Sequence, residues 1–174
     1  MQPTSATALA ALAAPMAPAA AGAHATVEPL DPAPPRAGSS VRFVLDAPNE
    51  ELTTPGTKVV LSIPRGARSR VRAQHTPGWA LDVRRRAVAG RTRLATMRLT
   101  WTAAPGHAVE PGETQRFRFR LRTPTRSGPL CFEIDQHYSP PGLGERPKID
   151  RWRGPVGSSR PTSCVRIAAP SARS

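Results

Sequence analysis

The chain has 174 residues, which is enough for one domain with a buried core, and no apolar run is long enough to form a transmembrane helix. Its 21 prolines and 13 glycines are scattered along the sequence, which argues against a helical bundle because proline disrupts a helix interior. The net charge of +13 comes almost entirely from 23 arginines, and a charge of this size is compatible with binding to nucleic acid, acidic polymers or anionic membrane surfaces.

The N-terminal segment has the composition of an export signal. The first 35 residues contain no lysine or arginine, and residues 1–23 are mostly small and mildly apolar. They end in Ala21-Gly22-Ala23, an A-x-A cleavage signature directly before His24. We therefore predict that residues 1–23 are a cleaved secretory signal peptide, although the usual positive n-region is missing. The alternative is a disordered tail rich in alanine and proline.

Short segments rich in strand-forming residues follow, separated by turn residues such as Pro111-Gly112. The expected strands are Val41–Leu45, Thr57–Ile63, Ser69–His75, Trp79–Arg86, Arg93–Thr102, Glu113–Arg122, Leu130–Tyr138 and Ser163–Ala168. This pattern predicts an all-β fold, an immunoglobulin-like or fibronectin-like antiparallel β-sandwich, with Trp79 and Trp101 in its core. We expect the domain to cover residues 24–168 and residues 169–174 to form a disordered tail.

The segment Arg116–Arg122 has the clearest strand pattern. Phe117, Phe119 and Leu121 alternate with four arginines, and a period of two places the two sets on opposite faces of a sheet. We interpret the arginine face as the solvated outer surface of the sandwich, with an anion-binding face as the alternative. Aromatic residues make up only 5% of the chain and do not interleave with arginine as in RNA-binding motifs, so no nucleic-acid partner is expected.

The two cysteines, Cys131 and Cys164, fit an exported protein with one disulfide. Closing that loop would stabilise the fold by about 3–4 kcal/mol. The alternatives are two unpaired buried thiols and a dithiol copper site, which such a distant pair favours least. We expect the protein to be secreted, or to lie in the periplasm or the extracellular cell envelope.

The four histidines are the residues with the most informative chemistry. The sequence contains no G-x-S-x-G, Walker loop, H-E-x-x-H or C-x-x-C motif. His75, His107 and His137 have no partner at metal-ligand spacing, and we interpret them as ordinary surface or strand residues. His24 differs because cleavage would leave its free α-amine and its ring Nδ1 able to chelate one metal ion. Copper(II) favours tetragonal nitrogen and oxygen ligands, and an amine with a pKa of about 8 can lose its proton to a metal.

A series of short motifs begins at His24. In order, they are His24-Ala25-Thr26-Val27, Pro48-Asn49-Glu50, Thr57-Lys58-Val59 with Pro64, Pro77-Gly78-Trp79, Thr100-Trp101-Thr102-Ala103, Pro111-Gly112-Glu113, Tyr138-Ser139 and Arg151-Trp152. In this set, from His24 to Trp152, the sequence resembles the YcnI-like copper-binding domain family. It departs from the family pattern in the insertion PPGLGERPKID after Ser139 and in having no C-terminal membrane helix, so we expect a soluble or released mature protein.

The resemblance implies a function and a set of site residues. Members of this family are exported β-sandwiches that bind copper(II) through a mono-histidine brace. Carried over, the amine and ring of His24 and the carboxylate of Glu50 would hold the metal, with Trp152 close to it. Glu51 is the alternative carboxylate, and Trp152 is alternatively a hydrophobic plug. The family is associated with copper homeostasis as a carrier rather than as an enzyme, so the expected partners are copper and a copper transporter or another copper carrier.

Two other functions stay open from the sequence. A copper-dependent oxidative enzyme would need a second histidine beside His24, which His75, His107 or His137 would have to supply. A basic cell-surface module would instead bind anionic polymers through its arginine faces and would need no metal.

Overall fold

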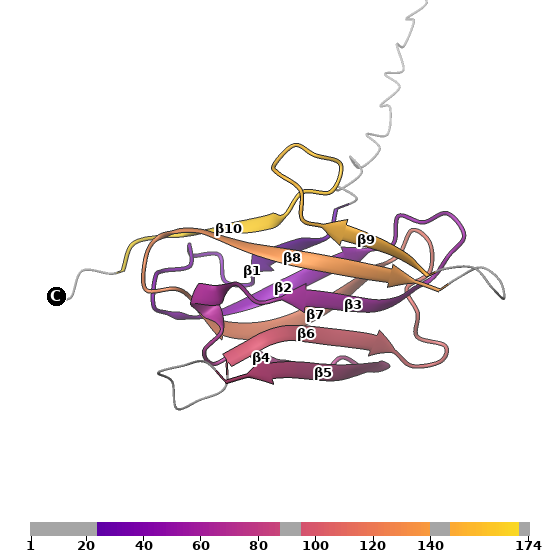
Figure 1. Ribbon diagram of the computed structural model, residues 1–174, viewed down its shortest axis with the longest axis horizontal. Helices are drawn as coiled ribbons and strands as arrows, with labels where there is room; N and C mark the ends of the chain where they lie inside the picture. The colour runs from indigo at the N-terminus through magenta and orange to yellow at the C-terminus, as the bar shows by residue number, and fades with distance from the viewer. Residues whose placement is uncertain (1–23, 88–94, 140–146, 171–174) are drawn as a thin grey trace, which may run out of the picture.

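The computed structural model describes residues 24–87, 95–139 and 147–170, and their fold is built almost entirely from β-strands (Figure 1). The strands are β1 Thr26–Pro29, β2 Ser40–Pro48, β3 Gly56–Ser62, β4 Arg72–Ala73, β5 Trp79–Arg86, β6 Ala95–Ala103, β7 Thr114–Arg122, β8 Gly128–Tyr138, β9 Lys148–Trp152 and β10 Ser163–Ile167. The helical element among these residues is the 3-10 turn η1, Arg65–Ala67. The predicted all-β fold is confirmed.

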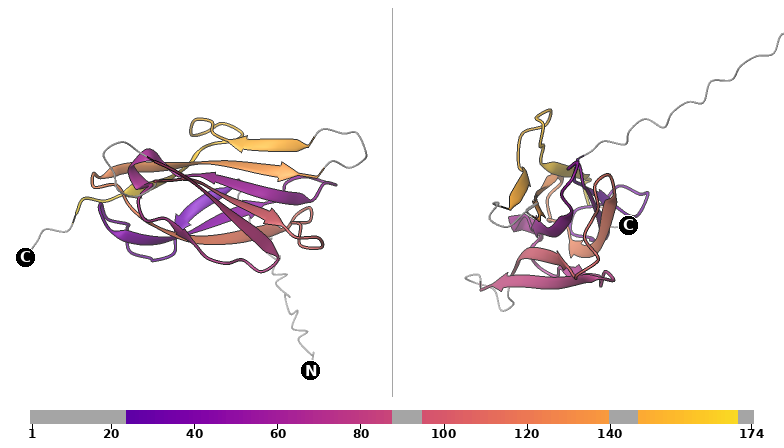
Figure 2. Two further views of the ribbon diagram at one scale, coloured as in Figure 1. Left: turned by 60° about the horizontal axis from the view of Figure 1, so that its bottom comes forward. Right: turned by 90° about the vertical axis from the view of Figure 1, so that its right-hand side faces the viewer.

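The strands form two antiparallel sheets that pack face to face (Figure 2). One sheet has the order β1-β2-β7-β4, and the other has the order β10-β8-β3-β6-β5. Strand β8 is long enough to serve two partners on one edge: β10 pairs with its first half and β9 with its second half. This arrangement brings β9, near the C-terminal end of the domain, next to the loop between β2 and β3.

The core lies between the two sheets and follows the alternation in the sequence. Phe117, Phe119 and Leu121 of β7 are at most 1% exposed, whereas the arginines between them face solvent. The expected core positions of Trp79 and Trp101 are confirmed, and both indoles lie against Phe117, with ring centroids 5.0 Å and 4.7 Å from it. Period-two patterning therefore determines which face of each sheet is buried.

The predicted disulfide between Cys131 and Cys164 is present. The two cysteines are directly opposite one another in the antiparallel register of β8 and β10. The bond therefore ties the last strand of the domain to the long strand β8.

Several expected strand limits are wrong. The segment Ser69–His75 contains only the two-residue strand β4, because Arg70 adopts a positive φ of 66° and interrupts the extended backbone. Strand β2 continues past Leu45 to Pro48, since Ala47 still faces the core and Pro48 still pairs with Thr114 of β7. Strands β1 and β9 have no counterpart among the expected strands.

Some expectations concern parts of the chain outside the described residues. These are the signal peptide (1–23), the start of the strand expected from Arg93, and the end of the expected tail (171–174). Within the part of the chain that the structure describes, no helix is long and apolar enough to span a membrane.

Candidate metal centre

His24 lies directly before β1, the edge strand of the four-stranded sheet, and this places it beside β9 at the edge of the other sheet. The next residue, Ala25, and Val27 are at most 2% exposed, so the backbone on both sides of Thr26 is anchored in the core. The Val27 amide donates a hydrogen bond of 2.7 Å to Ser163 Oγ, and β1 pairs with β2. The His24 side chain itself is 45% exposed, so its ring stands on a rigid base and faces solvent.

The loop that carries Glu50 is held by the buried side chain of Asn49. Its Nδ2 donates to the carbonyl oxygens of Thr54 and Val109 at 2.9 Å and 2.8 Å, and its Oδ1 accepts from the Glu51 amide at 2.9 Å. Every polar atom of this side chain therefore has a partner, which a buried amide requires. The tripeptide Pro48-Asn49-Glu50 thus contains its own positioning residue.

Glu50 faces the ring of His24. The Nδ1 atom of His24 and the Oε1 atom of Glu50 are 3.8 Å apart, which is too long for a hydrogen bond. Two donors that bind the same first-row metal ion at about 2 Å each lie at most about 4 Å apart, so this pair fits one ion. Partial burial raises the pKa of Glu50 above its ordinary value, and the nearby His24 acts in the opposite direction.

The indole of Trp152 packs against the ring of His24. The two ring centroids are 5.2 Å apart, with the planes tilted by 51°, and the indole is 1% exposed. The indole Nε1–H donates to Gln136 Oε1 at 2.6 Å, and Gln136 Nε2 donates to the carbonyl oxygen of Pro48 at 2.8 Å. Gln136 therefore connects Trp152 to the loop of Glu50. Because the indole nitrogen is donor-only, Trp152 contacts this site through its ring.

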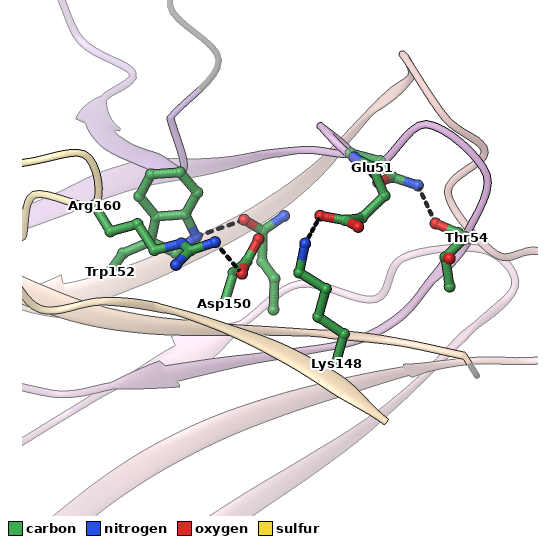
Figure 3. A network of polar contacts seen from close by, with 8 residues as sticks. Glu51, Thr54, Lys148, Asp150, Trp152 and Arg160 are labelled. Atoms are coloured by element: carbon green, nitrogen blue, oxygen red, sulfur yellow. Dashed lines mark hydrogen bonds and ion pairs between the residues drawn. The ribbon is translucent and has the colours of Figure 1, made fainter. Parts of the chain in front are cut away.

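Alternate side chains of β9 link that strand to the loops on both sides of it. Figure 3 shows Lys148, Asp150 and Trp152 projecting from the strand in the same direction. Lys148 forms an ion pair with Glu51, and Asp150 forms one of 2.6 Å with Arg160. Glu51, the alternative carboxylate ligand, is therefore already paired with a lysine. This favours Glu50 as the carboxylate that faces His24.

A buried tyrosine lies near the carboxylates of this region. The hydroxyl of Tyr138 has no hydrogen-bond partner among the described residues, and its pKa is raised, first by burial and then by the negative charge of Asp150, Glu51 and Glu50. Tyr138 therefore remains a neutral phenol over the whole physiological pH range.

Few side chains near His24 could serve as metal ligands. Among residues 24–87, 95–139 and 147–170, no group of three or more histidine, cysteine, aspartate or glutamate side chains is arranged to hold a metal ion. His75 and His107 are exposed at the surface, and His137 lies within β8. The side chains of His24 and Glu50 offer two donor groups. In a chain that begins at His24, the α-amine would offer a third.

The structure brings together all three residues expected at the site: His24, Glu50 and Trp152. The roles of Asn49 and Gln136 were not predicted from the sequence. Asn49 is the central residue of the Pro48-Asn49-Glu50 motif, so the motif itself pointed to a residue that positions Glu50. Gln136 is a polar residue at an inward position of a strand that is otherwise apolar on that face, which is a signal that a buried hydrogen-bond partner is needed.

The fold and this site define an immunoglobulin-like β-sandwich with a histidine and a carboxylate facing each other beside the edge strands β1 and β9. Residues 24–156 match the family model described as "Domain of unknown function (DUF1775)", and the chain belongs to this family. The matched region begins at His24 and includes Glu50 and Trp152. No curated protein has a matching sequence.

One solved structure supports the fold, and two others with lower TM-scores are more distantly similar. An uncharacterized protein from Nocardia farcinica, described as having an immunoglobulin-like fold, is 25% identical with a TM-score of 0.68, covering 84% of this chain and 99% of that chain. A cohesin module from Clostridium perfringens is 10% identical with a TM-score of 0.47, covering 86% of this chain and 100% of that one. Domains D2 and D3 of the pilin SpaD from Corynebacterium diphtheriae are 9% identical with a TM-score of 0.45, over 73% and 49% of the two chains.

Proposed function

We propose that this protein is an exported copper(II)-binding domain of the YcnI-like type that acts in copper homeostasis as a carrier or store. The observation that carries the proposal is the meeting of His24, Glu50 and Trp152, which come from three separate parts of the chain. The order of motifs that resembles the YcnI-like family and the DUF1775 match, which starts at His24, both support it.

In this proposal, copper is the cargo and the protein supplies nitrogen and oxygen donors. The α-amine and ring of His24 chelate the ion, and the Glu50 carboxylate neutralises part of its charge. The side chains of His24 and Glu50 are 45% and 32% exposed, so the ion would remain accessible from solvent. An acceptor protein can then displace the ligands one at a time, which allows transfer by ligand exchange without catalysis.

The donor set also predicts a redox preference. Amine, imidazole and carboxylate donors suit copper(II), whereas thiolate and thioether ligands suit copper(I). Reduction of the bound ion would therefore promote its release to an acceptor. A titration that gives equal affinity for the two oxidation states would contradict this part of the proposal.

The disulfide supports export. Disulfides persist in oxidising compartments, and the bond between Cys131 and Cys164 fits a protein that is secreted or held in the cell envelope. The partners we propose are copper ions and a transporter or carrier that supplies or accepts them.

The first test of this function is calorimetric titration of copper(II) into protein that begins at His24. We expect one tight site per chain, lost in the His24→Ala variant. The matched control is His75→Ala, because His75 is also exposed but lies outside the candidate centre. Equal affinity in the two variants would show that copper binds to surface histidines in general, and would contradict the proposal.

A further inference from the structure

A second site is suggested by a pocket of about 420 Å³ on the outer face of the six-stranded sheet. Its lining includes five arginines and one carboxylate: Arg65, Arg68, Arg84, Arg86, Arg98 and Glu133. No residue of the candidate metal centre lines it. The arginines come from the η1 region and from β5 and β6, so the fold gathers positive charge from segments that are separate in the sequence.

The strand register places like charges directly opposite each other. Arg84 of β5 faces Arg98 of β6, and Arg98 in turn faces Ser62 of β3. Like charges in directly opposed cross-strand positions are destabilising. An anion bound between Arg84 and Arg98 would relieve this repulsion.

The charge of the pocket is not neutralised by the described residues. None of the five arginines forms an ion pair with a described carboxylate, whereas Arg42, Arg116, Arg153 and Arg160 all do. The single acidic side chain of the lining, Glu133, lies 3.7 Å from Arg153 and is therefore shared with a cation outside the pocket. Residues 88–94, which follow β5, include no aspartate or glutamate.

The wall of the pocket is formed by a fixed segment. The Nε of Arg68 donates to the carbonyl oxygen of Ile63 at 2.9 Å, and the backbone carbonyl of Arg68 accepts from the Thr96 amide at 3.0 Å. The Ile63 amide in turn donates to the carbonyl oxygen of Met97 at 3.0 Å. This arrangement holds the Arg68 side chain in place, and its two terminal nitrogens form no hydrogen bond or ion pair with a described side chain or carbonyl.

We propose that this pocket binds a short phosphate chain. Guanidinium groups form paired, charge-assisted hydrogen bonds with phosphoryl oxygens. Five such groups around one shared carboxylate call for a ligand with several negative charges, because a single monoanion would leave most of the repulsion in place. An oligophosphate carries its charges close together along a narrow chain, and the pocket is large enough to hold several phosphoryl units.

The test measures binding of inorganic tripolyphosphate by calorimetry at about 0.15 M salt, where long-range attraction is screened. We expect tripolyphosphate to bind more tightly than citrate or sulfate, and the Arg84→Gln/Arg98→Gln variant to weaken binding about tenfold or more. A glycerophosphate oligomer, added in a separate arm, distinguishes a phosphodiester polymer from a free phosphate chain as the source. Tighter binding of the oligomer would overturn the choice of an oligophosphate.

The matched control is Arg72→Gln/Arg120→Gln, which removes another directly opposed arginine pair from the outer face of the other sheet. We expect this control to bind tripolyphosphate as the unmodified protein does. Equal weakening by both double variants would show a diffuse electrostatic effect, and equal affinity for citrate would show no phosphate preference; either result overturns the proposal. Thermal unfolding checks that the pocket variant is folded, and we expect its melting temperature to be unchanged or raised because like charges are removed.

Discussion

At the scale of residues, the candidate metal centre has two neighbouring carboxylates, of which one faces His24 and the other is paired with a lysine. Glu50 faces His24 at 3.8 Å, whereas its neighbour Glu51 is paired with Lys148. Two adjacent glutamates on one loop therefore have different surroundings. This difference provides a comparison in which the charge removed is the same in both variants.

We predict that Glu50→Gln weakens copper(II) binding about tenfold or more, since even the partners that only orient metal ligands contribute factors of this size. Glu51→Gln should leave the affinity nearly unchanged, because its carboxylate lies in an ion pair with Lys148. Calorimetric titration of both variants, beginning at His24, measures the difference. A larger loss of affinity in Glu51→Gln than in Glu50→Gln would contradict the assignment of Glu50 as the carboxylate ligand.

A second residue-scale prediction concerns Gln136, which accepts from Trp152 and donates to the carbonyl of Pro48. Gln136→Met keeps the volume but leaves both buried partners unsatisfied, so we expect a loss of about 1–3 kcal/mol in the free energy of unfolding. Urea denaturation followed by tryptophan fluorescence measures it. The control Gln115→Met, which removes a hydrogen bond to the Arg116 carbonyl at an exposed site, should change stability by less than about 0.5 kcal/mol.

His137 gives a prediction for pH. Burial lowers its pKa below the ordinary value of 6.5, and Lys58 and Arg151 act in the same direction against Asp135. The unfolded chain therefore takes up this proton more readily than the folded protein, so stability decreases as the pH falls below about 6.5. The midpoint of thermal unfolding should decrease less over this range in His137→Gln than in the unmodified protein. In His75→Gln, the control at an exposed position, the decrease should be unchanged.

The residues of the centre were predictable in part. His24 and Glu50 stand in short motifs of the sequence, so their juxtaposition could be expected from the family resemblance. Gln136 could not be assigned its role, because its partners are distant in sequence. Trp152 reaches it when β9 pairs with β8, and Pro48 reaches it when the two sheets pack together. Long-range hydrogen bonds of this kind depend on strand register, which alternation alone does not determine.

At the scale of elements, long strands with a clear sequence pattern were easier to predict than short ones. The strong alternation of β7 and the apolar residues of β8 predict both strands, whereas β1 and β9 have only four and five residues. These short strands each pair with a longer neighbour, β1 with β2 and β9 with β8. They are also the two elements that position His24 and Trp152, so the site rests on elements with the weakest local signal.

The disulfide between β8 and β10 closes a loop with a sequence separation of 33 residues. In the chain-entropy description, a loop of this length stabilises the fold by about 3–4 kcal/mol. We predict that Cys131→Ser/Cys164→Ser lowers the free energy of unfolding by about this amount, measured by urea denaturation under oxidising conditions. The unmodified protein treated with a reductant should lose a similar amount, and no loss in either case would contradict the expectation.

At the scale of the whole molecule, the fold separates two kinds of chemistry. His24 and the Glu50 loop meet beside the edge strands β1 and β9, whereas the arginine-lined pocket lies on the outer face of the sheet that contains β3, β5 and β6. Composition alone predicted the charge of +13 but not its distribution. The clustering of arginines on one sheet face depends on the strand register, which places Arg84 opposite Arg98. In our two proposals, a single sandwich carries a metal site beside its edge strands and an anion-binding pocket on the outer face of one sheet.

The central claim is that a free α-amine at His24 completes a copper(II) site with Glu50. The most direct measurement is an electron paramagnetic resonance titration with copper(II) of two forms of the protein that begin at His24, one with a free α-amine and one with that amine acetylated. We predict a single tetragonal, nitrogen-rich signal at one ion per chain for the free amine, and an affinity lower by about two orders of magnitude for the acetylated form, because the chelate is lost. Identical signals and affinities for the two forms would contradict the account.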